Sequence, residues 1–542
     1  MKISLFHGSE QYAVFEHAGD YGRFAVRVSG WSGLLRIRFS VPVLDVHGCW
    51  VPESRTPSAK LPWTVESRSA GQRAFPFLAF FNSAQVNRLS AGLTNLADDT
   101  KILAQMNQES CAYDITFEVA LGKDSGDFEL ILDQRPLLWT DCLADWRKTL
   151  GVKLPAFPDA AWEPVYCTWY AVHAAVTQDW VEENARIAAS LGFRTLIIDD
   201  GWCFDAMKRV SPETISTWYE WIGDWRLSKR KFPDFENHRK RVQAMGMKYL
   251  FWVAPFLIGV KSGLIKMIPG CFSEECREGC HVFDSRRRDA ADILLDKMKH
   301  VMADYGLDGL KVDFLDHIFP DTEDPRGRDT MRFVRKLAES VRAVKPDALL
   351  EFRQAYATPV MLPYATQFRA GDVPFDFLDN FLRILQIRVS MGDGVPVHAD
   401  PAFWHPRESP VNIARHMIAS LAGVPMLSMD LSRTGEMEKR IIRHWLGFYR
   451  EHRKTLNFGK WDISFLPGGA AYAMACDDAE SIVILLDSAH LGEALRKAAP
   501  RVFILNLSAE APALPGGKTW SGEGNRAPEG RIPPGGLGEL ER

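Results

Sequence analysis

Two patterns of hydrophobic and polar residues divide the chain. Up to about residue 140, short segments alternate apolar and polar positions, and turn residues separate them, as in residues 21–30, 33–41 and 113–121. A period of two is typical of strands that bury one face. The pattern predicts an N-terminal β-sandwich domain over residues 1–150. Three prolines within residues 153–164 then indicate a linker.

From residue 165 onward, short apolar runs alternate with helical patterns. The strand candidates are residues 165–170, 195–200, 248–255, 309–315, 349–354, 367–372, 395–400 and 424–430. The helical stretches between them have end signals, such as Thr177 before and Gly192 after the first, and Ser409 and Pro410 at the start of a later one. This alternation predicts a parallel (β/α)8 barrel, a TIM barrel, over residues 160–455. A doubly wound sheet is the rival fold, but no GxGxxG turn follows residues 165–170.

The last part of the chain, residues 456–542, returns to a β-like pattern. Residues 465–476 and 481–488 read as strands of a small C-terminal β-sandwich. Residues 514–542 are rich in glycine and proline and read as a loop or a frayed tail. The fold class predicted is therefore a multidomain α/β protein with a central barrel and two flanking β domains.

Composition narrows the classes of function. The 542 residues carry a formal net charge of −4 without a basic block, which argues against a nucleic-acid partner. No apolar run reaches membrane-spanning length and the first residues lack a signal-peptide pattern, so a cytoplasmic location is expected. Nine scattered cysteines indicate reduced thiols. The cluster Cys271, Cys276 and Cys280 has no common zinc-site spacing, so no metal is predicted there.

Charged and aromatic residues gather at the ends of the predicted strands, where barrel enzymes hold their catalytic groups. Lys311 and Asp313 alternate in one strand and therefore point to the same side. A buried ion pair between them is the structural interpretation. The functional interpretation is a polar barrel mouth, because many other predicted strand ends carry charged, polar or aromatic side chains. These residues are Trp169, Tyr170, Asp199, Asp200, Trp202, Trp252, Glu351, Arg353, Arg369, Asp372, His398, Asp400, Asp430 and Arg433. Carboxylates, cations and indoles together suit a sugar ring and its hydroxyls.

Two carboxyl groups are needed to cleave a glycosidic bond. Asp313 fits the nucleophile, since Lys311 beside it would keep its pKa low. Asp372 fits the proton donor, because the apolar residues 373–375 after it favour a raised pKa, whereas Arg369 acts in the opposite direction. Asp376 is the rival proton donor. Asp316 reads as a loop carboxylate or a helix cap, and His398 and Asp400 either line the leaving-group side or pair with each other.

Several segments resemble glycoside hydrolase family 36 in the α-galactosidase clan, clan D. They are IIDDGW at 197–202, GDW at 223–225, KFPDF at 231–235, GLKVDF at 309–314, GDVPFD at 371–376 and the region 396–410. The resemblance implies a retaining route through a glycosyl-aspartate, with Asp313 as nucleophile, Asp372 as acid/base and no cofactor. It also implies that Asp199 and Asp200 bind hydroxyls of the transferred sugar. Further substrate contacts are expected from Trp202, Trp225, Lys311, Arg353, Arg369, Trp169, Trp252 and His398.

The chain also departs from that family. Residues 351–360 stand where the family has a glycine-rich segment with a cysteine, and residues 251–256 lack the family's glutamate. These changes touch the sugar pocket, and Arg353 and Arg369 then suggest an anionic or otherwise modified sugar as an alternative to galactose.

The function predicted from the sequence is a retaining α-glycoside hydrolase, α-galactosidase-like, that acts on an oligosaccharide or glycoside. The alternatives are an α-transglycosidase, a non-catalytic carbohydrate-binding protein and a metal-dependent barrel lyase or isomerase. No nucleic acid or membrane is expected as a partner, and homo-oligomerisation stays open.

Overall fold

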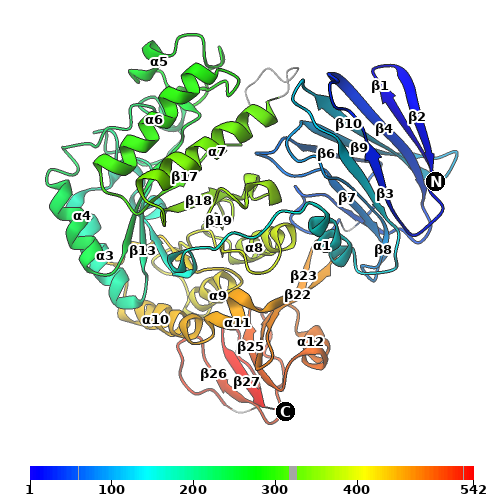
Figure 1. The fold of residues 1–542 in the computed structure, drawn as a ribbon. Helices are drawn as coiled ribbons and strands as arrows, with labels where there is room; N and C mark the ends of the chain where they lie inside the picture. The colour runs from blue at the N-terminus through cyan, green and yellow to red at the C-terminus, as the bar shows by residue number, and fades with distance from the viewer. Residues whose placement is uncertain (59, 317–325, 529, 542) are drawn as a thin grey trace.

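In the computed structural model, which describes residues 1–58, 60–316, 326–528 and 530–541, the chain begins with two antiparallel sheets (Figure 1). One sheet has the order β2-β1-β4-β10-β9-β6 and the other the order β3-β11-β8-β7-β5. Their strands are β1 Lys2–His7, β2 Glu10–Glu16, β3 Tyr21–Val26, β4 Gly33–Pro42, β5 Gly48–Trp50, β6 Thr64–Ser69, β7 Phe77–Phe81, β8 Asn87–Leu93, β9 Thr100–Asn107, β10 Ala112–Leu121 and β11 Phe128–Asp133. Buried and exposed residues alternate along β4 and β10, so the predicted period of two is confirmed.

Eight parallel strands form the centre of the molecule, in the order β20-β19-β18-β17-β14-β13-β12-β21. A parallel bridge between His398 and Val424 joins the two ends of this order and closes the barrel. The strands are β12 Val165–Cys167, β13 Thr195–Ile198, β14 Lys248–Val253, β17 Gly309–Val312, β18 Leu349–Arg353, β19 Gln367–Arg369, β20 Val397–His398 and β21 Met426–Leu427. The predicted TIM barrel is confirmed.

Helices surround the barrel (Figure 1). They are α3 Gln178–Leu191, α4 Phe235–Ala244, α6 Arg288–Asp304, α7 Gly327–Val344, α8 Phe377–Met391, α9 Pro410–Ser420 and α10 Glu436–Glu451. The Ser409 hydroxyl caps α9 by accepting a hydrogen bond from the Asn412 backbone N–H. Gly192 follows α3 with a φ of 120°, a conformation that favours glycine.

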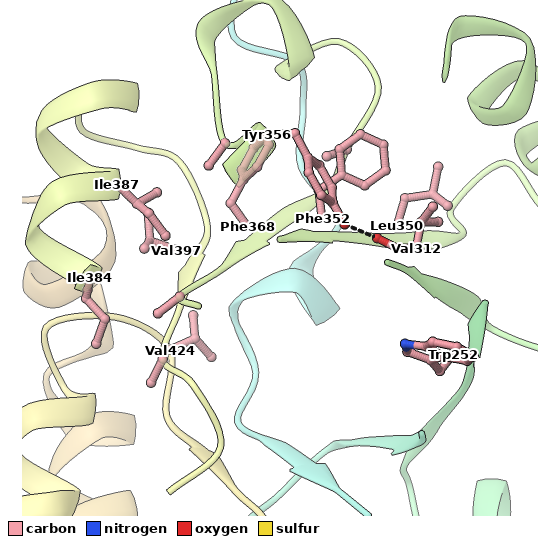
Figure 2. Close-up of a cluster of buried hydrophobic side chains, with 14 of the residues drawn as sticks. Trp252, Val312, Leu350, Phe352, Tyr356, Phe368, Ile384, Ile387, Val397 and Val424 are labelled. Carbon is pink, nitrogen blue, oxygen red and sulfur yellow. Dashed lines mark hydrogen bonds between the residues drawn. The ribbon is translucent and has the colours of Figure 1, made fainter. Parts of the chain in front are cut away.

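Alternate residues of the barrel strands face opposite sides. Val312, Phe352 and Phe368 are in register on neighbouring strands and point toward the helices, where Ile384 and Ile387 of α8 pack in the same buried cluster (Figure 2). Burying each such side chain stabilises the fold by about 1.5–3 kcal/mol. The intervening positions carry the charged residues, which the strand alternation turns into the lumen.

The first strand is shorter than the sequence indicates. It ends at Cys167, and residues Trp169–Val172 form the short helix α2. Trp169 and Tyr170 therefore lie on a helical turn beyond the strand, at the mouth of the barrel.

The C-terminal residues form a single six-stranded sheet with the order β22-β23-β24-β25-β27-β26, instead of the two layers expected for a sandwich. Its strands are β22 Lys460–Leu466, β23 Gly469–Cys476, β24 Glu480–Leu485, β25 Arg501–Asn506, β26 Lys518–Trp520 and β27 Leu537–Glu541. The prediction of a frayed tail is wrong, because β27 pairs antiparallel with β25 over five residues. Because turns rich in glycine and proline separate these short strands, the pattern of apolar and polar residues does not predict them.

The N-terminal sheets are attached to the mouth of the barrel. Arg55 forms an ion pair with Asp379 of α8 at 2.9 Å, and the Gln386 side chain donates a 2.6 Å hydrogen bond to the Pro52 carbonyl. Helix α1, Trp139–Thr149, stacks Trp139 on Trp50 of β5 at 5.0 Å between ring centroids. Among the described residues, no helix is both long and apolar enough to cross a membrane.

Candidate active site

Asp313 follows β17 directly and is 5% exposed. Its carboxylate accepts hydrogen bonds from the Trp252 indole N–H at 3.0 Å, from Arg353 Nη1 at 3.0 Å and from the Phe314 backbone N–H at 2.9 Å. Burial alone would raise the pKa of Asp313, but the nearby charges of Arg353, Lys311 and Arg369 outweigh burial and lower it well below its usual value. The carboxylate is ionised at any ordinary pH.

Lys311 does not form the ion pair with Asp313 that the structural interpretation of the sequence predicts. Its ammonium contacts Asp199 Oδ2 at 2.6 Å across the lumen. The same oxygen accepts a 3.1 Å contact from the Cys167 thiol, and the Thr168 hydroxyl accepts a hydrogen bond from the Asp199 backbone N–H. Lys311 therefore lowers the pKa of Asp313 only from a distance, while Arg353 is the cation in direct contact.

Asp372 lies three residues beyond β19, and its side chain is 44% exposed. Arg353 Nη2 contacts it at 2.6 Å and Arg369 Nη1 at 3.0 Å. Burial would raise the pKa of Asp372, but these two guanidinium groups outweigh it and lower the pKa below its usual value. The sequence leaves open whether apolar neighbours raise the pKa of Asp372 or Arg369 lowers it. In the structure, the two arginines lower it. One guanidinium, that of Arg353, bridges Asp313 and Asp372.

Asp376, the rival to Asp372, has a different environment. It is the N-cap of α8 and accepts hydrogen bonds from the backbone N–H groups of Leu378 and Asp379, both at 2.9 Å. This is an ordinary helix-capping role.

Arg369 is 2% exposed and is shared among acids. Besides Asp372 it contacts Asp400, and its Nε lies 3.7 Å from Glu351. Asp400 also accepts hydrogen bonds from the Tyr170 hydroxyl at 3.0 Å and from the Val373 backbone N–H at 2.8 Å. Burial raises the pKa of Asp400 to about 7. Asp400 thus lies behind Asp372, connected to it through Arg369.

His398 lies deeper in the barrel than the sequence suggests. It is fully buried, its Nε2 donates to the Ala161 carbonyl at 2.8 Å, and burial lowers its pKa to about 4. Its Nδ1 lies 3.6 Å from Glu351, and no pairing between His398 and Asp400 is seen. The His398 ring is therefore part of the barrel interior and is not exposed at the barrel mouth.

Three of the predicted tryptophans pack together behind Asp313. Trp252 is 2% exposed, and its indole N–H donates a hydrogen bond to the Asp313 carboxylate. Trp202, fully buried, donates to the Trp252 carbonyl at 2.8 Å, and Trp225, with a φ of 54°, packs against both rings. Only Trp169 of the four predicted tryptophans is half-buried at the mouth. The other three position Asp313 from behind.

The barrel sequence is matched by a family model described as Melibiase, over residues 155–336. Alpha-galactosidase AgaA of Geobacillus stearothermophilus is 22% identical over 331 residues, which are 56% of this chain and 43% of AgaA. Alpha-galactosidase of Escherichia coli is 29% identical over 129 residues, 23% of this chain and 16% of that protein. The crystal structure of GH36 α-galactosidase AgaA aligns with this chain with a TM-score of 0.67 and 15% identity. The aligned residues are 94% of this chain and 77% of the AgaA chain.

The chain is similar to GH36 α-galactosidases in the sequence of its barrel and in its overall fold. The galactosidase domain of AgaSK shares the same architecture, with a TM-score of 0.69 and 16% identity over 96% of this chain and 78% of that domain. The sequence matches span less than half the length of these two curated relatives.

Two contacts of the adjacent aspartates Asp199 and Asp200 could not be predicted from the sequence. The Trp218 indole donates to Asp200 Oδ2 at 2.7 Å, and the Cys167 thiol contacts Asp199. Burial raises the pKa of Asp200 to about 7, and its Oδ1 has no hydrogen-bond partner within the described part of the chain. Trp218 comes from the long loop between β13 and α4, where no spacing pattern marks it.

Over the described ranges, no three His, Cys, Asp or Glu side chains are grouped in a way that holds a metal ion. Cys271, Cys276 and Cys280 are free thiols.

Proposed function

We propose that the chain is a retaining α-glycosidase of the α-galactosidase type, with Asp313 as nucleophile and Asp372 as acid/base. One observation carries the proposal: two carboxylates from the ends of β17 and β19 meet across a barrel mouth closely enough to share the Arg353 guanidinium. Two carboxyl groups facing each other over a cavity are what a double displacement needs.

In the first step Asp313 attacks the anomeric carbon, and the bond to the leaving oxygen breaks. Trp252 and the Phe314 backbone N–H hold Asp313 in position throughout. Asp372 gives its proton to the leaving oxygen. In the second step Asp372 takes a proton from water, whose oxygen attacks the anomeric carbon and releases Asp313.

Asp372 must hold a proton before it can act, although the free enzyme keeps its pKa low. A sugar that binds between the two carboxylates would separate Arg353 from Asp372. Loss of that contact raises the pKa of Asp372 toward the range of a general acid. Arg353 thus couples occupation of the sugar site to the protonation of Asp372.

Galactose is the sugar we propose for the site. Relatives bind its α-glycosides: variants of AgaA were crystallised with raffinose and with stachyose, and TtGalA of Thermus thermophilus with p-nitrophenyl α-D-galactopyranoside. Asp199, Asp200 and Lys311 would bind the hydroxyls. An anionic sugar has less support, because Arg353 and Arg369 already pair with carboxylates.

A panel of nitrophenyl α-glycosides, run with the wild type and Asp313→Asn, tests the proposal. The α-galactoside should be the preferred substrate, and the variant should lose about a thousandfold or more in kcat. Full activity of the variant would refute the assignment of the nucleophile. Product analysis at high concentrations of an acceptor sugar separates hydrolysis from glycosyl transfer.

A further inference from the structure

A cavity of about 410 Å³ lies where the N-terminal sheets meet the barrel mouth. Its walls come from segments around Pro52 and Ala74 on one side, and from the end of β18 and one face of α8 on the other. Hydrogen bonds cross the junction, from the Ala74 backbone N–H to the Ala355 carbonyl at 3.3 Å and from the Gln386 side chain to Pro52. The cavity is therefore part of the docked architecture.

The cavity adjoins the two candidate catalytic acids. Arg353 lines it, together with Phe314, which follows Asp313, and Gly371, which precedes Asp372. A Cβ atom at position 371 would lie 2.5 Å from Arg383 Nη1, so glycine lets this guanidinium approach the backbone beside Asp372. A leaving group protonated by Asp372 would have this cavity next to it.

The walls of the cavity carry more cations than acids. The charged lining residues are Arg55, Arg73, Arg353, Arg383, Glu53 and Asp316. Arg55 and Arg383 share a single carboxylate, Asp379, at 2.9 and 3.2 Å. Arg73 is exposed and makes no ion pair within 4 Å with any residue that the structure describes. Arg73 is thus a cation of the cavity wall with no acid paired to it in the described part of the chain.

The acids of the cavity do not cancel this excess. Glu53 is bound by the Ser67 hydroxyl at 2.7 Å and by the Arg68 backbone N–H at 2.9 Å, so its carboxylate turns toward β6. Asp316 lies at the catalytic end, two residues after Phe314. A ligand with a neutral sugar at Asp313 and a negative charge farther out matches this arrangement.

We propose that the cavity binds an acidic group, a carboxylate or a phosphate, on the leaving-group part of the substrate, with Arg73 as its principal contact. The inference rests on the proposed α-galactosidase function and extends it: the enzyme cleaves α-galactosides whose aglycone is anionic. Arg55 and Arg383 supply the surrounding positive charge.

Paired substrates test this specificity. One pair is an α-galactosyl glucuronic acid and its methyl ester; the other is α-galactosyl glycerol phosphate and α-galactosyl glycerol. Each pair keeps the scissile bond and changes only the distal charge, and the two pairs distinguish carboxylate from phosphate. In the wild type, kcat/KM should favour the acidic member by about tenfold through KM, and added salt should reduce the ratio.

Arg73→Gln should lower the acidic-to-neutral ratio to within about threefold of one, and Arg73→Glu should reduce it further. The control is Arg68→Gln: Arg68 is 61% exposed on β6 and does not line the cavity, so its ratio should equal that of the wild type. Equal rates within both pairs for the wild type would overturn the inference while the α-galactosidase proposal stands. A ratio that persists in Arg73→Glu would also overturn it. Failure to cleave any α-galactoside would remove the proposed function itself.

Discussion

Removal of the guanidinium that bridges the two candidate catalytic acids should move the whole pH profile. The change is Arg353→Gln, which removes one positive charge from contacts of 3.0 Å with Asp313 and 2.6 Å with Asp372. Without that charge, the protonated form of each carboxyl becomes relatively more favourable, so both pKa values rise. Activity needs Asp313 ionised and Asp372 protonated, and both limbs of the profile should therefore shift to higher pH.

The size of each shift follows from exposure. The Asp372 side chain is 44% exposed, so a water-like dielectric applies, and a charge at this distance contributes about 1.6 kcal/mol, or about one pKa unit. The Asp313 side chain is only 7% exposed. Its contact with arginine is worth about 1–3 pKa units in a buried setting. The basic limb should move by about one pH unit and the acidic limb by at least as much.

The assay is kcat/KM for an aryl α-galactoside over a range of pH, since this quantity reports the ionisation of the free enzyme. Arg353→Lys, which keeps a cation at the position, should restore most of the wild-type basic limb. A basic limb that stays in place in Arg353→Gln would refute either the role of Asp372 or its coupling to Arg353.

Three further outcomes follow from the same site. Asp372→Asn should lose much more activity on a galactoside with a poor leaving group than on one with a good leaving group, whereas equal losses would exclude it as the acid. Asp376→Asn should cost at most about 2 kcal/mol of unfolding free energy, because a helix cap is weakened, and should leave the leaving-group dependence unchanged; a change in that dependence would favour Asp376 as the acid. Burial raises the pKa of Asp200 to about 7, above that of the unfolded chain, so its contribution to stability is complete at low pH and is lost as pH rises through 7. Relative to Asp200→Asn, the wild type should therefore lose about 2–4 kcal/mol of unfolding free energy between pH 4 and pH 8, measured by denaturant titration, and parallel curves would contradict this.

The barrel was predictable because its strands and helices repeat a regular pattern. All eight strand segments chosen from apolar runs contain a barrel strand, and their order in the chain is their order around the barrel. The ends were less predictable: the strand before Tyr170 stops three residues earlier, since the chain turns into α2. The domain boundaries near residues 150, 160 and 455 stay a prediction.

The positions of the candidate site residues at strand ends could be predicted from the sequence, but the contacts between them could not. Alternation places Lys311 and Asp313 on one side of a strand, yet Lys311 pairs with Asp199, 112 residues away in the sequence. Spacing along one strand does not report which side chains meet across the lumen. The same limit explains why the bridging position of Arg353 and the hydrogen bond from Trp218 to Asp200 appear only in the structure.

The most direct test of the account is to trap the covalent intermediate. A slowly turned over fluorinated α-galactosyl fluoride is incubated with the wild type, and the labelled peptide is identified by mass spectrometry. We expect one added fluorogalactosyl group, bound to the Asp313 carboxylate, with the anomeric fluoride released. A label on Asp372 or on another residue, or full turnover by Asp313→Asn, would contradict it.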